Sequence, residues 1–323
     1  MKPPALVGAV AGGWTRLSPN HRGALWMIAA SLGFTLNSAL VKALTIGPAG
    51  AEGLDVFQIA FARALFSFAL LLPFLLRAGR GCLATRHPVK HGIRAVAGAV
   101  AMVCSFYAVG RLHLADFTAL SFTQPLFVTV LAVALLGEVV RWRRWVATAV
   151  GFLGVLVMVR PGASTFDPAA LVALASVAGI ALAVCLVKRL PVGESQVTML
   201  AYFCLVSLAI TVVPAVIWWT PPSATQWLLL AGVGGLGVAS QAMIIRAYRS
   251  GEASFVAPFD YLKLILAGLI GFAVFDEVPG LWTFAGAAVI VGATLYIARR
   301  EAARELEPRG ERRVFGGKAQ QHQ

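Results

Sequence analysis

The sequence has 323 residues, of which 59% are hydrophobic and only 13% are charged, and its mean hydropathy is +0.80. Soluble domains carry about 25% charged residues, so the composition excludes a soluble protein and indicates a polytopic membrane protein. A net charge of +13 favours nucleic-acid binding in a soluble chain. Here the basic residues follow a membrane topology, described below, and we expect no nucleic-acid partner.

Ten apolar runs approach or exceed the roughly 20 helical residues needed to cross the hydrocarbon core. Their unbroken apolarity favours helices over barrel strands, which alternate with a polar lumen face. We therefore predict an all-α integral membrane protein with ten transmembrane helices. In chain order the expected spans are Gly23–Leu44, Val56–Leu76, Gly92–Gly110, Ala115–Leu136, Trp145–Val159, Pro168–Val187, Gln196–Trp219, Gln226–Ala247, Ala253–Phe275 and Leu281–Ala298.

The basic residues predict the orientation. When the loops are assigned alternately to two sides, most of the 27 Lys and Arg residues fall on the side that holds both termini. The opposite side contains "TIGPAGAEGLD", "TPPSATQ" and "DEVPG", which have no Lys or Arg. Lys and Arg gather in cytoplasmic loops, so we expect a multi-pass protein of the inner (plasma) membrane with both termini in the cytoplasm.

The chain divides into two similar halves. Sliding the second half back by 139 residues places "TQPLFVTVLAVALLGEVV" on "LKLILAGLIGFAVFDEVP", so that Glu138 meets Glu277. The "VKAL" that closes the first span likewise corresponds to the "VKRL" that closes the sixth. Five helices in each half must enter the membrane in opposite senses, as in the inverted repeats of secondary transporters. The expected organisation is a cytoplasmic tail (1–22), two five-helix repeats (23–160 and 161–300) and a basic cytoplasmic tail (301–323).

Asp260 and Lys263 lie inside the ninth span, where a single charge costs about 2.5–3.5 kcal/mol on insertion scales. They are three residues apart and can touch on one helix face. The repeat maps them onto Ser121 and Gln124 of the fourth span. Two interpretations stay open: the pair faces a ligand or gates its path, or it is a structural pair that neutralises itself.

A polar stripe follows one face of the first span, formed by Ser31, Thr35, Ser38 and Lys42 at spacings of 4, 3 and 4 residues. Hydroxyl groups in membrane helices often bond to their own helix, so Lys42 is the strongest member. It either faces the substrate or snorkels to the interface. Asn37 lies off the stripe and is expected to bond a neighbouring helix.

Arg63 lies about 10 Å inside the second span, judged from the helical rise per residue. Its counterpart in the other half is Cys204, so the fold itself does not require the charge. We interpret Arg63 as functional, with pairing to Glu52 or Asp55 as the structural alternative. Tyr261 is an aromatic candidate for lining the same cavity.

Other motifs are set aside. "GVGGLG" matches a dinucleotide-binding pattern, but it lies in a membrane span instead of after a strand. No G-x-x-x-x-G-K-[ST] sequence is present, so no ATP-driven motor is expected. We predict no cofactor, no metal and no catalytic residue. An intramembrane lipid-modifying enzyme is kept as the alternative of another class.

The ends of the two halves, "LLGEVVRWRRWVATAVGFLGVLVMVRPG" and "VFDEVPGLWTFAGAAVIVGATLYIARR", resemble the drug/metabolite transporter superfamily in its ten-helix EamA-type form. Asp276 departs from the family pattern, in which Gly is usual. The segments "APFDYLKL" and "FARALFSFALLLP" are most similar to the branch that takes up S-adenosylmethionine or riboflavin. The resemblance implies a central cavity at Gln124, Asp260, Tyr261 and Lys263.

Together these observations predict a secondary transporter that moves a small organic metabolite by alternating access, as an uptake system for a cofactor-like molecule. Export of amino acids or related metabolites is the alternative within the family. The predicted contacts are a small-molecule substrate and the lipid bilayer, and a homodimer is left open. The substrate-binding or gating residues are predicted to be Asp260, Lys263, Tyr261, Gln124, Ser121, Arg63, Lys42, Thr35 and Ser38.

Overall fold

The computed structural model describes residues 18–48, 51–78, 85, 87–140, 142–163, 166–187 and 196–306. Within these residues every regular element is a helix, and ten helical stretches are long and apolar enough to cross a membrane. The predicted all-α membrane fold is therefore confirmed. The predicted tails before residue 18 and after residue 306 lie outside the described residues.

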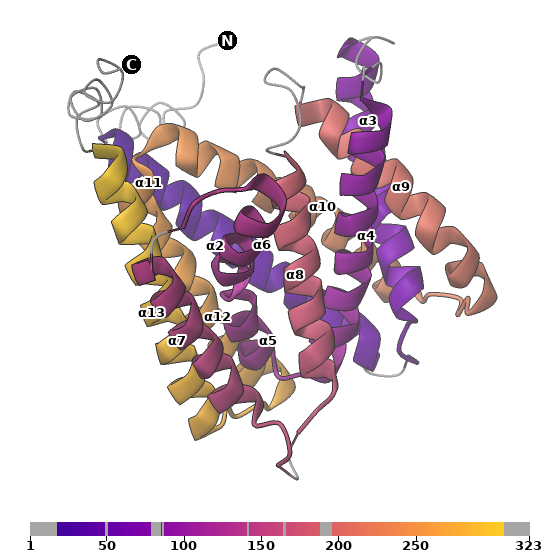
Figure 1. Ribbon diagram of the computed structural model, residues 1–323. Helices are drawn as coiled ribbons and strands as arrows, with labels where there is room; N and C mark the ends of the chain where they lie inside the picture. Colours follow the sequence, from indigo (N-terminus) through magenta and orange to yellow (C-terminus); the bar gives the residue numbers. More distant parts are fainter. Residues whose placement is uncertain are drawn as a thin grey trace, which may run out of the picture.

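The first half contains α2 to α7 and the second half α8 to α13 (Figure 1). The final helix continues past the expected end of the last span at Ala298. The helices are α2 (Pro19–Ile46), α3 (Val56–Ala78), α4 (Pro88–Arg111), α5 (Leu114–Ser121), α6 (Gln124–Leu136), α7 (Trp142–Val159), α8 (Ala169–Val187), α9 (Gln196–Ile217), α10 (Ala224–Ser250), α11 (Ala253–Val256), the 3-10 helix η2 (Ala257–Tyr261), α12 (Leu262–Phe275) and α13 (Leu281–Leu306).

Local sequence signals set several helix ends. The side chain of Ser18 caps α2, where Pro19 supplies a fixed φ at the first turn. Ser223 and Gln226 form a reciprocal capping box at the start of α10. Gly137 ends α6 in the left-handed conformation, and Asp276 does the same for α12 with a φ of 53°. Asp tolerates this conformation better than most residues, which explains the departure from Gly.

The fourth and ninth spans are each interrupted, a feature that the apolar runs did not reveal. The fourth span divides at Phe122 and Thr123 between α5 and α6, and the ninth passes through η2 between α11 and α12. Pro125 and Pro258 lie in the first turn of the segment after each break. Proline lacks an N–H donor and clashes with the preceding turn, so a helix restarts at each proline.

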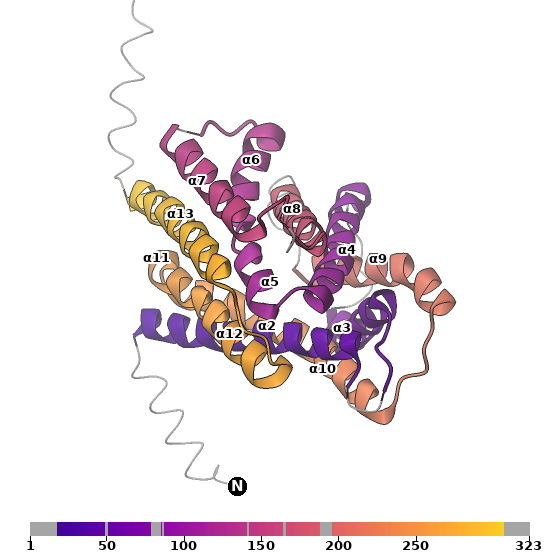
Figure 2. The ribbon, with the colours of Figure 1, turned by 90° about the horizontal axis from the view of Figure 1, so that it is seen from below.

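The two halves pack on each other in symmetric pairs. α2 packs on α10 and α4 on α8, and the inverted repeat exchanges these two pairs. α3 packs on α9 and α7 on α13, which pairs each helix with its own counterpart. Figure 2 shows α3, α4, α8 and α9 gathered on one side of the bundle, and α6, α7 and α13 on the other. The expected inverted repeat is thus visible in the packing.

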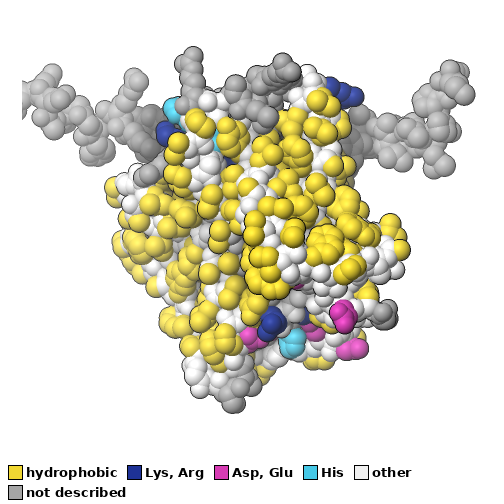
Figure 3. All heavy atoms as spheres, turned by 90° about the vertical axis from the view of Figure 1, so that its right-hand side faces the viewer, with side chains coloured by type: hydrophobic (Ala, Val, Ile, Leu, Met, Phe, Trp, Pro, Cys, Tyr) yellow, Lys and Arg dark blue, Asp and Glu magenta, His cyan; other side chains and the backbone are white. Residues whose placement is uncertain are grey.

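We call the side where α2 begins and α13 ends the terminal side, and the opposite side the far side (Figure 1). Apolar side chains cover the face seen in Figure 3, and charged side chains gather near its two ends. Large apolar residues are exposed on the outside of the molecule, such as Phe74, Leu228 and Leu269. This distribution is expected where lipid, not water, surrounds the helices.

Candidate functional site

Asp260 and Lys263 form the predicted ion pair, with 2.5 Å between Lys263 Nζ and Asp260 Oδ1. The two side chains are 25% and 17% exposed, respectively. Ser31 of α2 donates a hydrogen bond of 3.4 Å to Asp260 Oδ1. Lys263 Nζ lies 4.8 Å from the ring centroid of Phe34, also on α2. The break in the ninth span therefore presents a polar, partly accessible pair to the first helix of the other half.

The breaks of the two spans meet inside the bundle. The ring of Phe122, in the fourth-span break, lies 4.8 Å from the ring of Tyr261, at the end of η2. Gln124 and Ser121 flank the fourth-span break and are partly exposed. The Ser121 hydroxyl donates to the carbonyl of Thr118 at 2.6 Å, within its own helix. Tyr261 and Gln124 thus lie at the meeting point of the halves.

Thr35 and Ser38, the other hydroxyl-bearing residues of the polar stripe on α2, contribute less to the site than Ser31 does. Thr35 donates to the carbonyl of Ser31 at 2.8 Å, which is the local bond expected of a hydroxyl inside a membrane helix. Ser38 is partly exposed. Asn37 donates to the carbonyl of Val233 at 2.7 Å, which ties α2 to α10 and confirms the bond predicted for it.

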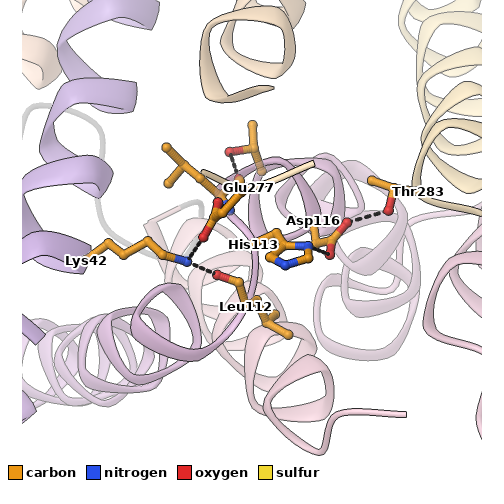
Figure 4. A network of polar contacts seen from close by, with 8 residues as sticks. Lys42, Leu112, His113, Asp116, Glu277 and Thr283 are labelled. Atoms are coloured by element: carbon orange, nitrogen blue, oxygen red, sulfur yellow. Dashed lines mark hydrogen bonds and ion pairs between the residues drawn. The ribbon is translucent and has the colours of Figure 1, made fainter. Parts of the chain in front are cut away.

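Lys42 lies away from Asp260, in a buried network on the far side (Figure 4). It is 4% exposed, forms an ion pair with Glu277 and donates to the carbonyl of Leu112. The Glu277 carboxylate also accepts the Leu114 N–H at 2.7 Å. The alternative that Lys42 snorkels to the interface was wrong, because a buried acid from the other half holds its ammonium group.

A second contact lies beside this network. Thr283, at the start of α13, donates to Asp116 of α5 at 2.6 Å, and His113 lies 3.4 Å from the same carboxylate (Figure 4). The Thr283–Asp116 contact joins the two halves on the far side, whereas His113 and Asp116 both belong to the first half. Sequence analysis did not select Glu277 as a site residue, although its alignment with Glu138 was the available signal. Lys188, the counterpart of Lys42, lies outside the described residues.

Arg63 points between α3, α4, α9 and α10. Its Nη1 donates to Met102 Sδ at 2.6 Å, and its Cζ lies 5.8 Å and 5.9 Å from the ring centroids of Phe106 and Phe203. Its Nε is buried and has no hydrogen-bond partner. Pairing with Glu52 or Asp55, the structural alternative, is not found.

Two surface hollows lie elsewhere. One, of about 410 Å³, is formed by the start of α2 and the end of α10, and the other, of about 420 Å³, lies between α7 and α13. Neither includes a predicted site residue. Within the described part of the chain, no three His, Cys, Asp or Glu side chains come together as metal ligands. The partly exposed Asp260–Lys263 pair is therefore the candidate centre of the site.

The chain is similar to known transporters over most of its length. The model of the EamA-like transporter family matches residues 21–160 and 167–299. An S-adenosylmethionine uptake transporter of Rickettsia prowazekii is 31% identical, over 86% of this chain and 93% of its own length. A riboflavin transporter of Vibrio cholerae is 32% identical, over 89% and 96%.

A solved crystal structure that is 21% identical aligns with a TM-score of 0.55, over 87% of this chain and 99% of its own. It supports the fold alone. The family model covers most of this chain, and each alignment with the two relatives covers most of both proteins. These matches therefore show the family as well as the fold. The chain therefore belongs to the EamA-like transporter family, as a multi-pass protein of the inner membrane that transports small molecules.

Proposed function

We propose that this transporter takes up a cofactor-like metabolite of the S-adenosylmethionine class by alternating access between its two inverted halves. The observation that carries the proposal is the Asp260–Lys263 pair, which lies at a helix break between the halves and stays partly exposed. The names of the relatives support uptake of a cofactor-like molecule. The protein moves this molecule without changing it chemically.

Helix breaks at matching positions in both halves suit such a site. Discontinuous helices near the midplane offer backbone polar groups and half-helix ends to a substrate, which continuous helices cannot do. The Phe122–Tyr261 contact brings the two breaks together. Asp260 is suited to a cationic group of the substrate, or to a coupling proton. Tyr261, Gln124 and Ser38 are proposed as further contacts, with Ser121 and Thr35 as supporting positions.

The distribution of basic residues among the loops supports an orientation with both termini in the cytoplasm. The far side then faces the periplasm. There, Lys42, Glu277, Asp116 and Thr283 connect the halves, and α2 packs on α4. The inverted counterpart of that packing is α8 on α10 at the terminal side, and the described residues show no comparable contact between them. The conformation is therefore closed toward the periplasm.

Alternating access requires these far-side contacts to open and re-form. We propose Lys42 and Glu277 as the periplasmic latch, so that Lys42 acts as a gating residue and does not bind substrate. The lipid bilayer surrounds the bundle, in keeping with its exposed apolar surface. A homodimer stays a prediction.

Uptake into proteoliposomes tests this function. Proteoliposomes that contain the purified protein should accumulate labelled S-adenosylmethionine, and liposomes without protein serve as the control. Uptake of labelled riboflavin should be measured in the same assay. We expect at least a tenfold loss of uptake for Lys263→Met and for Asp260→Asn. Unchanged uptake in both variants would remove the pair from the site. Transport of neither compound by a folded protein would exclude the proposed substrate class.

A further inference from the structure

We infer that Arg63 binds a carboxylate of the transported molecule, at the place where α3, α4, α9 and α10 meet. This inference rests on the proposed transport function and adds to it a requirement for the substrate. The predicted site residues include three cations, Arg63, Lys42 and Lys263. The structure separates them.

The three cations differ in whether a carboxylate neutralises them. Lys42 is paired with Glu277, and Lys263 is paired with Asp260. Within the described chain no carboxylate lies within ion-pair distance of Arg63, whose only hydrogen bond is to the sulfur of Met102. A thioether is a weak acceptor, and an arginine cannot lose its proton in a protein. Of the three cations, Arg63 is thus the one that no carboxylate of the described residues neutralises.

The surroundings of Arg63 leave its hydrogen-bonding capacity unused. The rings of Phe106 and Phe203 flank the guanidinium, and contacts of this kind stabilise a cation without occupying its N–H groups. Nε is buried without a hydrogen-bond partner, while part of the side chain remains accessible. A guanidinium presents a planar fork that matches a carboxylate through two parallel hydrogen bonds.

Glycine lets α10 lie close to the guanidinium. A Cβ atom at Gly237 would lie 3.3 Å from both Nε and Nη2 of Arg63. A side chain at this position would therefore press on the guanidinium and shift it. Gly235, two residues away on the same helix, has open space around its corresponding position. The close approach is therefore specific to the helix face that meets Arg63.

Inverted symmetry explains why only one half carries the arginine. Cys204 is the counterpart of Arg63, and it follows Phe203, whose ring lies against the guanidinium. A residue that lies beside its own counterpart is close to the axis relating the halves. Two arginines there would place like charges together in a medium of low dielectric constant. A single arginine instead provides one site for one anion on that axis.

A carboxylate suits the surroundings of Arg63 better than a phosphate does. One guanidinium balances a single negative charge, whereas the apolar groups of Met102, Phe106 and Phe203 would leave the second charge of a phosphate without a partner. S-Adenosylmethionine carries a carboxylate, and riboflavin carries none. Arg63 therefore favours a substrate built like an amino acid over a neutral flavin.

Matched ligand pairs test the inference. Binding to the purified protein is measured by calorimetry for S-adenosylmethionine against decarboxylated S-adenosylmethionine, for tryptophan against tryptophanamide, and for a carboxymethyl flavin against lumiflavin. We expect the acid member of whichever scaffold binds to bind at least about tenfold more tightly, the scale of a charge-assisted hydrogen bond. Arg63→Gln should abolish this preference, and Arg63→Lys should keep part of it.

Two further variants separate binding from packing. Arg94→Gln changes another arginine of the bundle, which donates to the carbonyl of Met199, and it should leave the acid preference intact. Gly237→Ala should weaken acid binding several-fold, while Gly235→Ala should not. Equal binding of acid and neutral members by the wild type, or binding of no acid at all, would overturn the inference. A preference shown only by the carboxymethyl flavin would keep the inference and exclude S-adenosylmethionine.

Discussion

The two intramembrane ion pairs differ in how they are built. Lys42–Glu277 joins residues from opposite halves, is 5% and 9% exposed, and receives two additional backbone contacts, from Leu112 and Leu114. Asp260–Lys263 joins neighbours in one segment, is more exposed, and is contacted by the Ser31 hydroxyl at 3.4 Å and by the ring of Phe34. The two pairs combine the same kinds of charged group but are suited to different roles.

The two ion pairs differ in how readily each ion can exchange its partner. A buried pair whose remaining hydrogen-bonding groups are satisfied is costly to break, because each ion would be left without solvent. A partly exposed pair can exchange its partner for water or for a ligand at little cost. The far-side pair is suited to holding a closed state, and the mid-span pair is suited to meeting a substrate.

The largest effect is expected on breaking the buried pair. Glu277→Gln leaves Lys42 as an unpaired buried cation, which should lower the free energy of unfolding by about 3–5 kcal/mol. Denaturation of the purified protein in detergent measures this change. The double variant Lys42→Met with Glu277→Leu should recover most of the loss. The exposed neighbour Asp276→Asn is the matched control, and equal destabilisation by it would contradict the comparison.

The mid-span pair should show the opposite balance between stability and transport. Asp260→Asn should change the free energy of unfolding by about 1 kcal/mol or less, since the pair is partly exposed. The same variant should lose most of its uptake in the proteoliposome assay. A loss of stability as large as that of Glu277→Gln would show that the pair is structural.

Helix α2 carries Lys42 and also Ser31, which contacts Asp260, and its packing on α10 can be tested by mutation. Gly33 of α2 lies against Ser240 of α10, and a Cβ atom there would be 2.3 Å from the serine oxygen. Gly33→Ala should therefore destabilise the protein by about 1–3 kcal/mol, the usual cost of overpacking. Thermal unfolding measures this loss, and combination with Ser240→Gly should restore part of it. Full stability of Gly33→Ala alone would argue against this close packing.

The smallest effect is expected at the hydroxyls of α2. Ser31→Ala removes a long contact to Asp260 and should reduce uptake by no more than a few-fold. Thr35→Ala, whose hydroxyl bonds its own helix, should reduce uptake less than Ser31→Ala does. Initial uptake rates of the two variants give the comparison, and a larger loss for Thr35→Ala would reverse the assignment of these positions.

The amount that could be predicted differs between elements. The ten spans follow from runs of apolar residues, and the Asp260–Lys263 pair follows from a spacing of three. The helix breaks were missed because Pro125 and Pro258 lie inside long apolar runs, where hydropathy alone gives no signal. The partner of Lys42 was missed because no local spacing connects it to Glu277.

By itself, the sequence determined the membrane fold, the two inverted halves and the cost of every charge placed inside them, because these depend on composition and helical period. Only the tertiary structure decided which charges neutralise one another. That choice depends on contacts between helices far apart in the chain. It leaves Lys42 bound to Glu277 on the far side, and Arg63 without an acidic partner among the residues that the structure describes.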